Sequence, residues 1–141
     1  MNRYLALFGA LAVMLCLVSH ARLVAAHHSS TMYDHSKTVT IKGTVVELRW
    51  VNPHVSVLIK GIVDGGTTEE EWLMEMTSPG NLVRAGGWSR NAVKAGDEVI
   101  VEFSPLRDTS LRGGALKKLT VVATGKVYTA NIRAQEMPGL E

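Results

Sequence analysis

Histidine is the residue type in this chain best placed to do chemistry, because four of its five copies follow a stretch typical of an export signal. If cleavage follows Ala26, the processed chain begins with a histidine that offers a free amine and an imidazole together. Such a residue chelates divalent metals, and copper(II) prefers nitrogen ligands. The sequence therefore predicts a site for copper or another divalent metal near the processed start. The candidate ligands are His27, His28, His35 and His54.

His54 is the preferred partner for His27 in this metal hypothesis. It closes the run Trp50-Val51-Asn52-Pro53-His54, in which proline stiffens the chain before a predicted strand. The start of a strand gives the imidazole a fixed direction, which a flexible terminus does not provide. His28 and His35 are the alternative donors of a third nitrogen.

Two other interpretations of the histidines remain open. Zinc is an alternative to copper, with Asp34 or Glu71 completing the ligand set. Alternatively, the histidines lie on an exposed terminus and bind no specific metal.

The start of the chain has the pattern of a cleaved signal peptide. Arg3 precedes an apolar run of 15 residues, Tyr4 to Val18, which is shorter than the roughly 20 that span a membrane. Cleavage after Ala26 is preferred, and cleavage after Ala21 is the competing site, which would remove the terminal chelate. We therefore expect residues 1–26 to be a signal peptide and the protein to be periplasmic or secreted from a bacterium. The membrane is then a partner only before cleavage.

Charge and cysteine content limit the classes of partner and cofactor. The chain has 15 basic and 13 acidic residues, and loss of Arg3 and Arg22 with the signal leaves 13 of each. A balanced domain lacks the basic footprint of nucleic-acid binders, so we expect no nucleic-acid partner. Cys16, the only cysteine, lies within the predicted signal, which excludes disulfides and thiolate metal sites from the processed chain.

The remaining chain has the pattern of a small β-protein. Alternating apolar residues predict five strands, and a change of phase beside Gly43 predicts a bulge in a long, bent first strand. Ser78-Pro79 predicts a helix start and Gly86-Gly87 its end. The strands are expected at 38–50, 54–63, 70–76, 98–103 and 116–122.

Three strands, a helix and two strands follow the order of an OB-fold. We therefore predict a mainly β fold, a small five-stranded OB-like barrel with a short helix between strands three and four. A β-sandwich of the same strands is the alternative. The barrel domain is expected to span residues 27–125, and residues 126–141 are expected to form a weakly ordered C-terminal tail.

Several motifs in fixed order resemble an uncharacterised family of small secreted bacterial proteins, a domain of unknown function. The resemblance runs from about Ala26 to Val122, and it implies a signal peptide followed by one compact β-domain that begins at the paired histidines. It implies no established activity. The motifs are Ala26-His27-His28-Ser29-Ser30, Trp50-x-Asn52-Pro53-His54, Ser78-Pro79-x-Asn81-Leu82-x-Arg84-x-Gly86-x-Trp88, Lys94-x-Gly96-Asp97 and Gly113-Gly114-x-Leu116.

These observations favour a non-enzymatic exported binding protein over an enzyme, since the sequence has no nucleophile elbow, phosphate-binding loop or dinucleotide fingerprint. Trp50, Asn52 and Trp88 are candidates for a ligand surface. The alternative function is a structural or interaction domain without metal. It would dock a periplasmic partner through the polar loop at 105–114 or the surface around Trp88.

Overall fold

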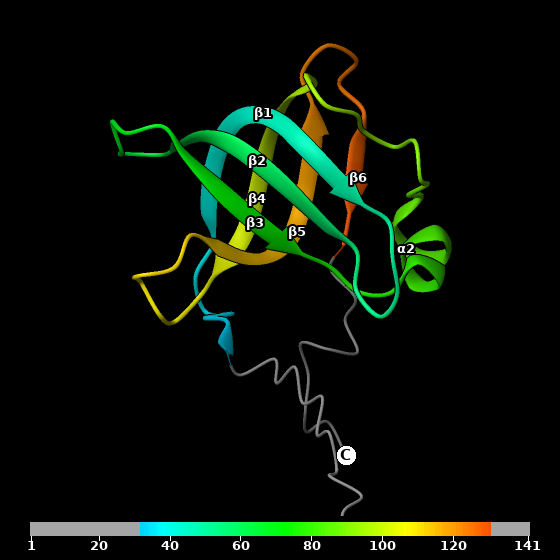
Figure 1. The fold of residues 1–141 in the computed structure, drawn as a ribbon, viewed down its shortest axis with the longest axis horizontal. Coiled ribbons are helices and arrows are strands. Elements are labelled where there is room, and N and C mark those ends of the chain that lie inside the picture. The colour runs from blue at the N-terminus through cyan, green and yellow to red at the C-terminus, as the bar shows by residue number, and fades with distance from the viewer. Residues whose placement is uncertain (1–31, 131–141) are drawn as a thin grey trace, which may run out of the picture.

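The computed structural model describes residues 32–130, in which β-branched and aromatic residues form five main strands. The short helix α2 lies between the third and fourth strands, so the predicted mainly β, OB-like barrel with a helix at this point is confirmed (Figure 1). The elements are β1 (Val39–Arg49), β2 (Ser56–Val63), β3 (Glu70–Glu75), α2 (Pro79–Gly86), β4 (Glu98–Pro105) and β5 (Gly113–Val121).

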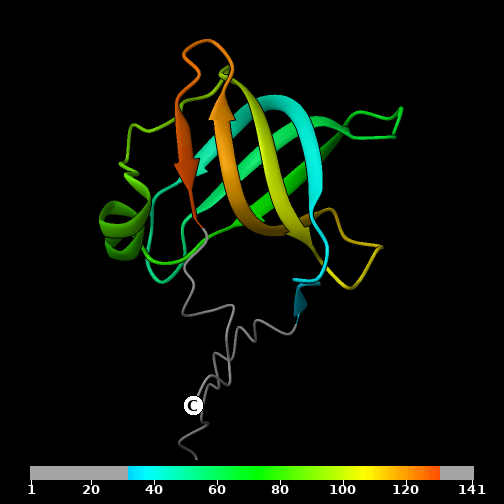
Figure 2. The same cartoon turned by 180° about the vertical axis from the view of Figure 1, so that it is seen from behind.

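The barrel closes where β3 meets β5. The strand order is β3-β2-β1-β4-β5, with antiparallel neighbours throughout, and a parallel pairing of β3 with β5 joins the two ends (Figures 1 and 2). The long β1 makes this possible, because it pairs with β2 along one edge and with β4 along the other. This mixed pairing distinguishes the fold from the β-sandwich alternative.

Two consecutive glycines allow β5 to approach both of its neighbours closely, β3 at Gly113 and β4 at Gly114. Gly113 is paired with Leu73, and a Cβ atom on this glycine would lie 2.7 Å from the Leu73 carbonyl oxygen. A Cβ atom on Gly114 would collide with the Ser104 carbonyl oxygen and the Phe103 ring. A side chain at Gly113 would therefore force the closing strands apart, and one at Gly114 would push β5 away from β4.

The bulge expected in β1 is present, although not beside Gly43. The register against β2 shifts between Val45 and Glu47, so Val46 is the extra residue. Val45 is only 1% exposed whereas Val46 is 39% exposed, so the inward face changes at Val46 and not beside Gly43. The phase of the apolar pattern alone did not locate the extra residue.

The barrel interior is filled by the apolar residues that alternate along the strands. The inward positions expected from alternation in the second, third and fourth strands are buried, except that Trp72 is only partly buried and packs against the core. Leu82 of α2 is also fully buried in this core. The buried strand residues include Ile41, Val55, Val57, Ile59, Met74, Val99, Val101, Phe103, Leu116 and Leu119.

The boundaries of α2 follow from its capping residues. The Ser78 hydroxyl accepts a hydrogen bond from the Asn81 backbone N–H, and Pro79 occupies the first turn. Gly87 ends the helix with φ 66°, a left-handed conformation that favours glycine. Within residues 32–130, no helix has the length and apolar character needed to cross a membrane.

Ordered structure continues beyond the expected boundary at residue 125. A short strand, β6 (Val127–Thr129), pairs with β5, and Tyr128 is buried against Trp88 with 4.9 Å between ring centroids. The start of the expected tail therefore belongs to the folded domain, because its aromatic residue completes the core beside α2. The predicted signal peptide, residues 1–26, and the rest of the tail, residues 131–141, lie outside the described part of the chain.

Barrel closure can be tested by placing a methyl group at the seam. We expect Gly113→Ala to lower the free energy of unfolding by about 1–3 kcal/mol, because the Leu73 carbonyl is backbone and cannot rotate away. Gly80→Ala is the matched control, since no atom lies within 4 Å of its added Cβ. Urea unfolding followed by tryptophan fluorescence measures both variants; equal stability of the two would contradict the steric account.

Candidate functional site

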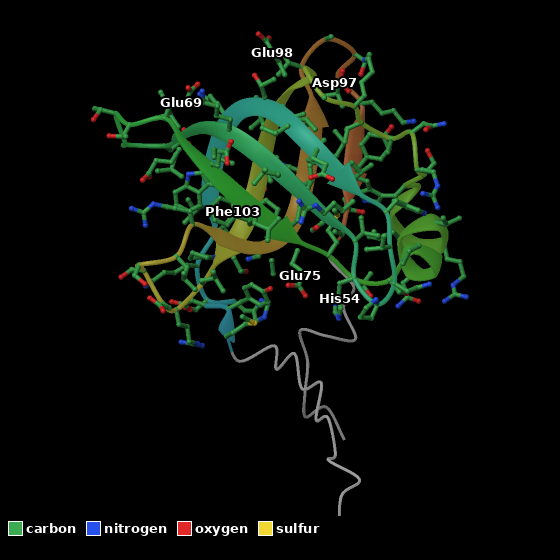
Figure 3. All side chains as sticks on the ribbon, viewed as in Figure 1. His54, Glu69, Glu75, Asp97, Glu98 and Phe103 are labelled. Atoms are coloured by element: carbon green, nitrogen blue, oxygen red, sulfur yellow. The ribbon has the colours of Figure 1, made fainter. Side chains whose placement is uncertain are left out.

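His54 and Glu75 lie side by side on the outside of the barrel, where β2 begins and β3 ends (Figure 3). Ser56 is paired directly with Glu75, and the ladder continues through a 2.8 Å hydrogen bond from Met76 N–H to the Val55 carbonyl. Side chains two residues apart share a face of a strand, so His54 and Glu75 are diagonal neighbours across the two strands. Strand register therefore fixes this contact.

The surroundings of the His54 ring determine which nitrogen carries the proton. Its Nδ1 lies 2.9 Å from the Met76 carbonyl oxygen and 3.2 Å from Glu75 Oε1, with the side chain 32% exposed. A carbonyl and a carboxylate only accept hydrogen bonds, so Nδ1 must donate. The lone pair of the neutral ring is then on Nε2, the arrangement found in histidines that bind metals through Nε2.

Tyr33 completes this cluster from a distant part of the sequence. It forms a β-bridge with Leu106, and its hydroxyl donates a 3.0 Å hydrogen bond to Glu75 Oε2. One carboxylate therefore accepts a hydrogen bond from Tyr33 on one oxygen, and its other oxygen lies within ion-pair distance of His54 Nδ1. Burial, then the negative charge of Glu75 and the hydrogen bond to it, raises the pKa of the Tyr33 phenol well above its ordinary value.

Backbone hydrogen bonds hold residues 32–37, here called the leading segment, against the base of the loop between β4 and β5. Arg107 N–H donates to the Met32 carbonyl at 2.9 Å, and Asp34 N–H donates to the Pro105 carbonyl at 2.8 Å. The described chain thus starts close to the closing seam of the barrel. The leading segment brings Tyr33 to the outer face that carries His54.

The other predicted histidine ligands are not brought together with His54 by any contact described here. His27 and His28 lie outside the described residues. His35 is half-buried, its ring centroid is 6.0 Å from that of Tyr33, and both of its ring nitrogens are buried without a hydrogen-bond partner. Residues 32–130 contain no group of three or more His, Cys, Asp or Glu side chains that could hold a metal ion. A complete site would need donors from residues before 32.

The carboxylate beside His54 differs from those proposed for zinc. Hydrogen bonds from Ser36 and Lys37 occupy Asp34 and lower its pKa to about 2. Glu71 is exposed and paired with Lys60 in the β2–β3 register. Glu75 was missed because its position on the outward face of a strand, shared with Glu71, is typical of a solvated edge; only the register with β2 identifies it.

The three candidates for a ligand surface have different environments. Trp50 is partly buried and packs against the core, whereas Asn52 is exposed and precedes a cis peptide bond to Pro53. Trp88 is only 2% exposed, and its indole N–H donates a 2.9 Å hydrogen bond to the Thr129 carbonyl. The proposed surface role of Trp88 is therefore corrected, because its ring fills the space between α2 and β6.

The contact of Tyr33 with Glu75 predicts a loss of stability in alkali. A phenol with a raised pKa in the folded state stabilises the fold below its ordinary pKa, about 10, and loses this contribution as pH rises further. We expect the unfolding free energy to fall between about pH 9.5 and 11.5 more steeply in the native chain than in Tyr33→Phe. Urea midpoints across this range measure the difference, and parallel declines would refute the prediction.

The chain matches one family among known proteins. A family model described as a family of unknown function, DUF6152, matches residues 13–115, which include the predicted histidine motifs and most of the barrel. No curated protein and no solved structure matches the chain. The predicted resemblance to a domain of unknown function is confirmed, while the signal peptide remains a prediction. This small β-barrel chain belongs to the DUF6152 family of unknown function.

Proposed function

We propose that this protein is an exported, non-enzymatic binding module that holds one copper(II) ion between His27 and His54. In this proposal a signal peptidase cleaves after Ala26, and the new terminus supplies its amine and one imidazole nitrogen. His54 supplies a third nitrogen, so that the donor set suits the tetragonal geometry that copper(II) prefers. The proposal places the protein in the periplasm or outside the cell.

The observation that carries this proposal is the hydrogen bonding of the His54 ring. Metal-binding histidines usually donate their second ring N–H to a carboxylate or a backbone carbonyl, which fixes the tautomer and increases the basicity of the ligating nitrogen. His54 has both kinds of acceptor at Nδ1, the Met76 carbonyl and the Glu75 carboxylate. Its Nε2 therefore has the electronic character of a ligand.

Chain length also supports the proposal. His27 is six residues before Tyr33, and six extended residues span up to about 20 Å. The Tyr33 hydroxyl and the His54 ring contact the same carboxylate, so the route from the proposed terminus starts beside the proposed ligand. The segment is long enough for the terminal amine to reach His54, and no large rearrangement of the barrel is required.

Copper uptake by the processed protein tests the proposal directly. The full chain is expressed in a bacterium, purified from the periplasm, and its first residue is identified by mass spectrometry. We expect calorimetry to show saturable uptake of one copper(II) per chain, and His27→Ala and His54→Ala each to abolish it, because each loses an imidazole donor. Absence of saturable uptake by a native chain that starts at His27 would exclude the proposal.

Two controls separate a terminal chelate from general affinity of histidine for copper. A Gly-Ser-Gly-Ser insertion after Ala26 that remains after cleavage keeps every histidine but moves the amine away from the imidazoles of residues 27 and 28; we expect it to weaken binding as strongly as His27→Ala. His35→Ala removes a histidine of the leading segment and should leave binding unchanged. Full affinity in the extended chain would contradict the use of the terminal amine.

A second candidate function, docking of a periplasmic partner without metal, is favoured by exposed leucines near the loop between β4 and β5. Leu111 in this loop is 54% exposed and Leu73 of β3 is 44% exposed. Arg112, in contrast, bonds to Glu70 at 2.8 Å and lies over the Trp72 ring at 5.6 Å, so it stabilises the barrel itself. Leu111 is therefore the better residue with which to test docking.

Pull-down from a periplasmic extract distinguishes the two candidates. Under the docking hypothesis, the His27→Ala variant still captures the partner protein, whereas the Leu111→Ser variant does not. The reason is that Leu111→Ser replaces an exposed apolar side chain of the proposed interface with a polar one. If both variants capture the same proteins as the native chain, the loop at 105–114 is not the docking surface.

A further inference from the structure

We propose that the outer face of β1, β2 and β3 binds a second copy of this chain and forms a symmetric dimer. This face carries a row of apolar side chains, and no described helix or loop crosses it (Figure 1). The inference goes beyond the proposed function, because it uses only residues of the folded barrel and needs no metal. The apolar row consists of Val46, Leu58 and Leu73.

Strand register aligns the apolar row across three strands. Leu58 of β2 is paired with Leu73 of β3, and on its other side it lies opposite the bulge of β1 that contains Val46 and Glu47. Val46 is 39% exposed and Leu73 is 44% exposed. Apolar side chains grouped on an outer face are typical of protein–protein interfaces, and interfaces between identical chains are the more apolar ones.

The next row along the strands has opposite charges at its two ends. Arg49 of β1 is paired with Ser56 of β2, which is paired with Glu75 of β3. Arg49 donates a 2.9 Å hydrogen bond to Glu47 through Nε, and its terminal nitrogens have no hydrogen bond among the described contacts. Because a guanidinium has five N–H donors, Arg49 can bind a second carboxylate. The face therefore offers unused donors at its β1 edge and an acidic group at its β3 edge.

A twofold axis parallel to β2 makes both rows self-complementary. Such an axis exchanges the two sides of the face, so β1 of one copy lies over β3 of the other. Arg49 then faces Glu75 of the second copy, Val46 faces Leu73, and Leu58 faces Leu58. Each unlike contact occurs twice, as the symmetry of an isologous interface requires.

The other twofold arrangement of the same faces is unfavourable. An axis perpendicular to the strands through the apolar row would exchange the two ends of β3, because Glu71 and Glu75 lie two residues on either side of Leu73. It would place Glu75 over Glu71 of the second copy, and like charges directly opposite each other are destabilising. Charge complementarity therefore selects the axis parallel to the strands.

Two neighbouring positions are compatible with the parallel axis. Gly113 is paired with Leu73 on the side away from β2, and without a side chain it leaves that side of Leu73 open to the second copy. Lys60, on β2, would face its own copy across the axis. Its 3.1 Å ion pair with Glu69 neutralises this charge within each chain.

Sedimentation equilibrium of the chain purified from the periplasm, in the presence of a metal chelator, tests the inference. We expect a reversible dimer. Leu58→Ser and Leu73→Ser should each raise the dimer dissociation constant about tenfold or more, because a symmetric interface contains every substitution twice. Val83→Ser is the matched control: Val83 is 55% exposed on α2, outside this face, and its loss should leave association unchanged.

Charge reversal tests the direction of the axis. Arg49→Glu and Glu75→Arg should each weaken association, because like charges then face each other. A mixture of the two variants should associate about as well as the native chain, since each contact again joins a carboxylate and a guanidinium. Circular dichroism checks that every variant is folded, and the two leucine variants decide the inference if Glu75→Arg is not.

Each outcome supports or overturns the dimer. A native chain that stays monomeric up to submillimolar concentration would overturn it, and so would a dimer that neither leucine variant weakens. Two folded charge variants that fail to associate when mixed would overturn the twofold arrangement. A monomeric chain that captures another protein through Leu73 would assign the face to that protein instead. None of these results depends on copper uptake, so the inference and the proposed function fail separately.

Discussion

The parallel pairing of β3 with β5 is the constraint on which the rest of this structure depends. It closes the barrel, and it requires Gly113 because the Leu73 carbonyl occupies the space that a side chain would need. The same pairing places Glu75, at the end of β3, beside Ala115 of β5. A steric requirement of the fold therefore positions the acidic group to which both His54 and Tyr33 bind.

The Tyr33–Glu75–His54 network links parts of the chain that are far apart in sequence. It combines a diagonal contact between adjacent strands with a segment held by the loop between β4 and β5. Neither part has the donors of a metal site, because residues 32–130 hold no group of three or more side chains that could bind a metal ion. The network matters for the proposed function because it orients the His54 imidazole close to Tyr33, near the start of the described residues.

The fold could be predicted from the sequence to a large extent, because alternation, capping residues and turn glycines are local signals. Val55, Val57 and Ile59 are buried as their spacing indicates, and Ser78 caps α2 as expected. Features that depend on the pairing of strands could not be predicted from the apolar pattern of the sequence. The bulge in β1 was expected beside Gly43 but lies at Val46, because its position is set by pairing with the neighbouring strand.

The candidate site was predicted only in part for the same reason. His54 was identified from its residue type and the proline before it, but the contact with Glu75 requires the register of two strands, and Tyr33 requires the path of the leading segment. Paramagnetic broadening by one equivalent of copper(II) in NMR spectra of the processed chain tests the central claim most directly. The account predicts broadening centred on Tyr33, His54 and Glu75, with signals of Asp97 and Glu98 at the opposite end of the barrel unaffected (Figure 3). Broadening centred elsewhere, or none, would contradict it.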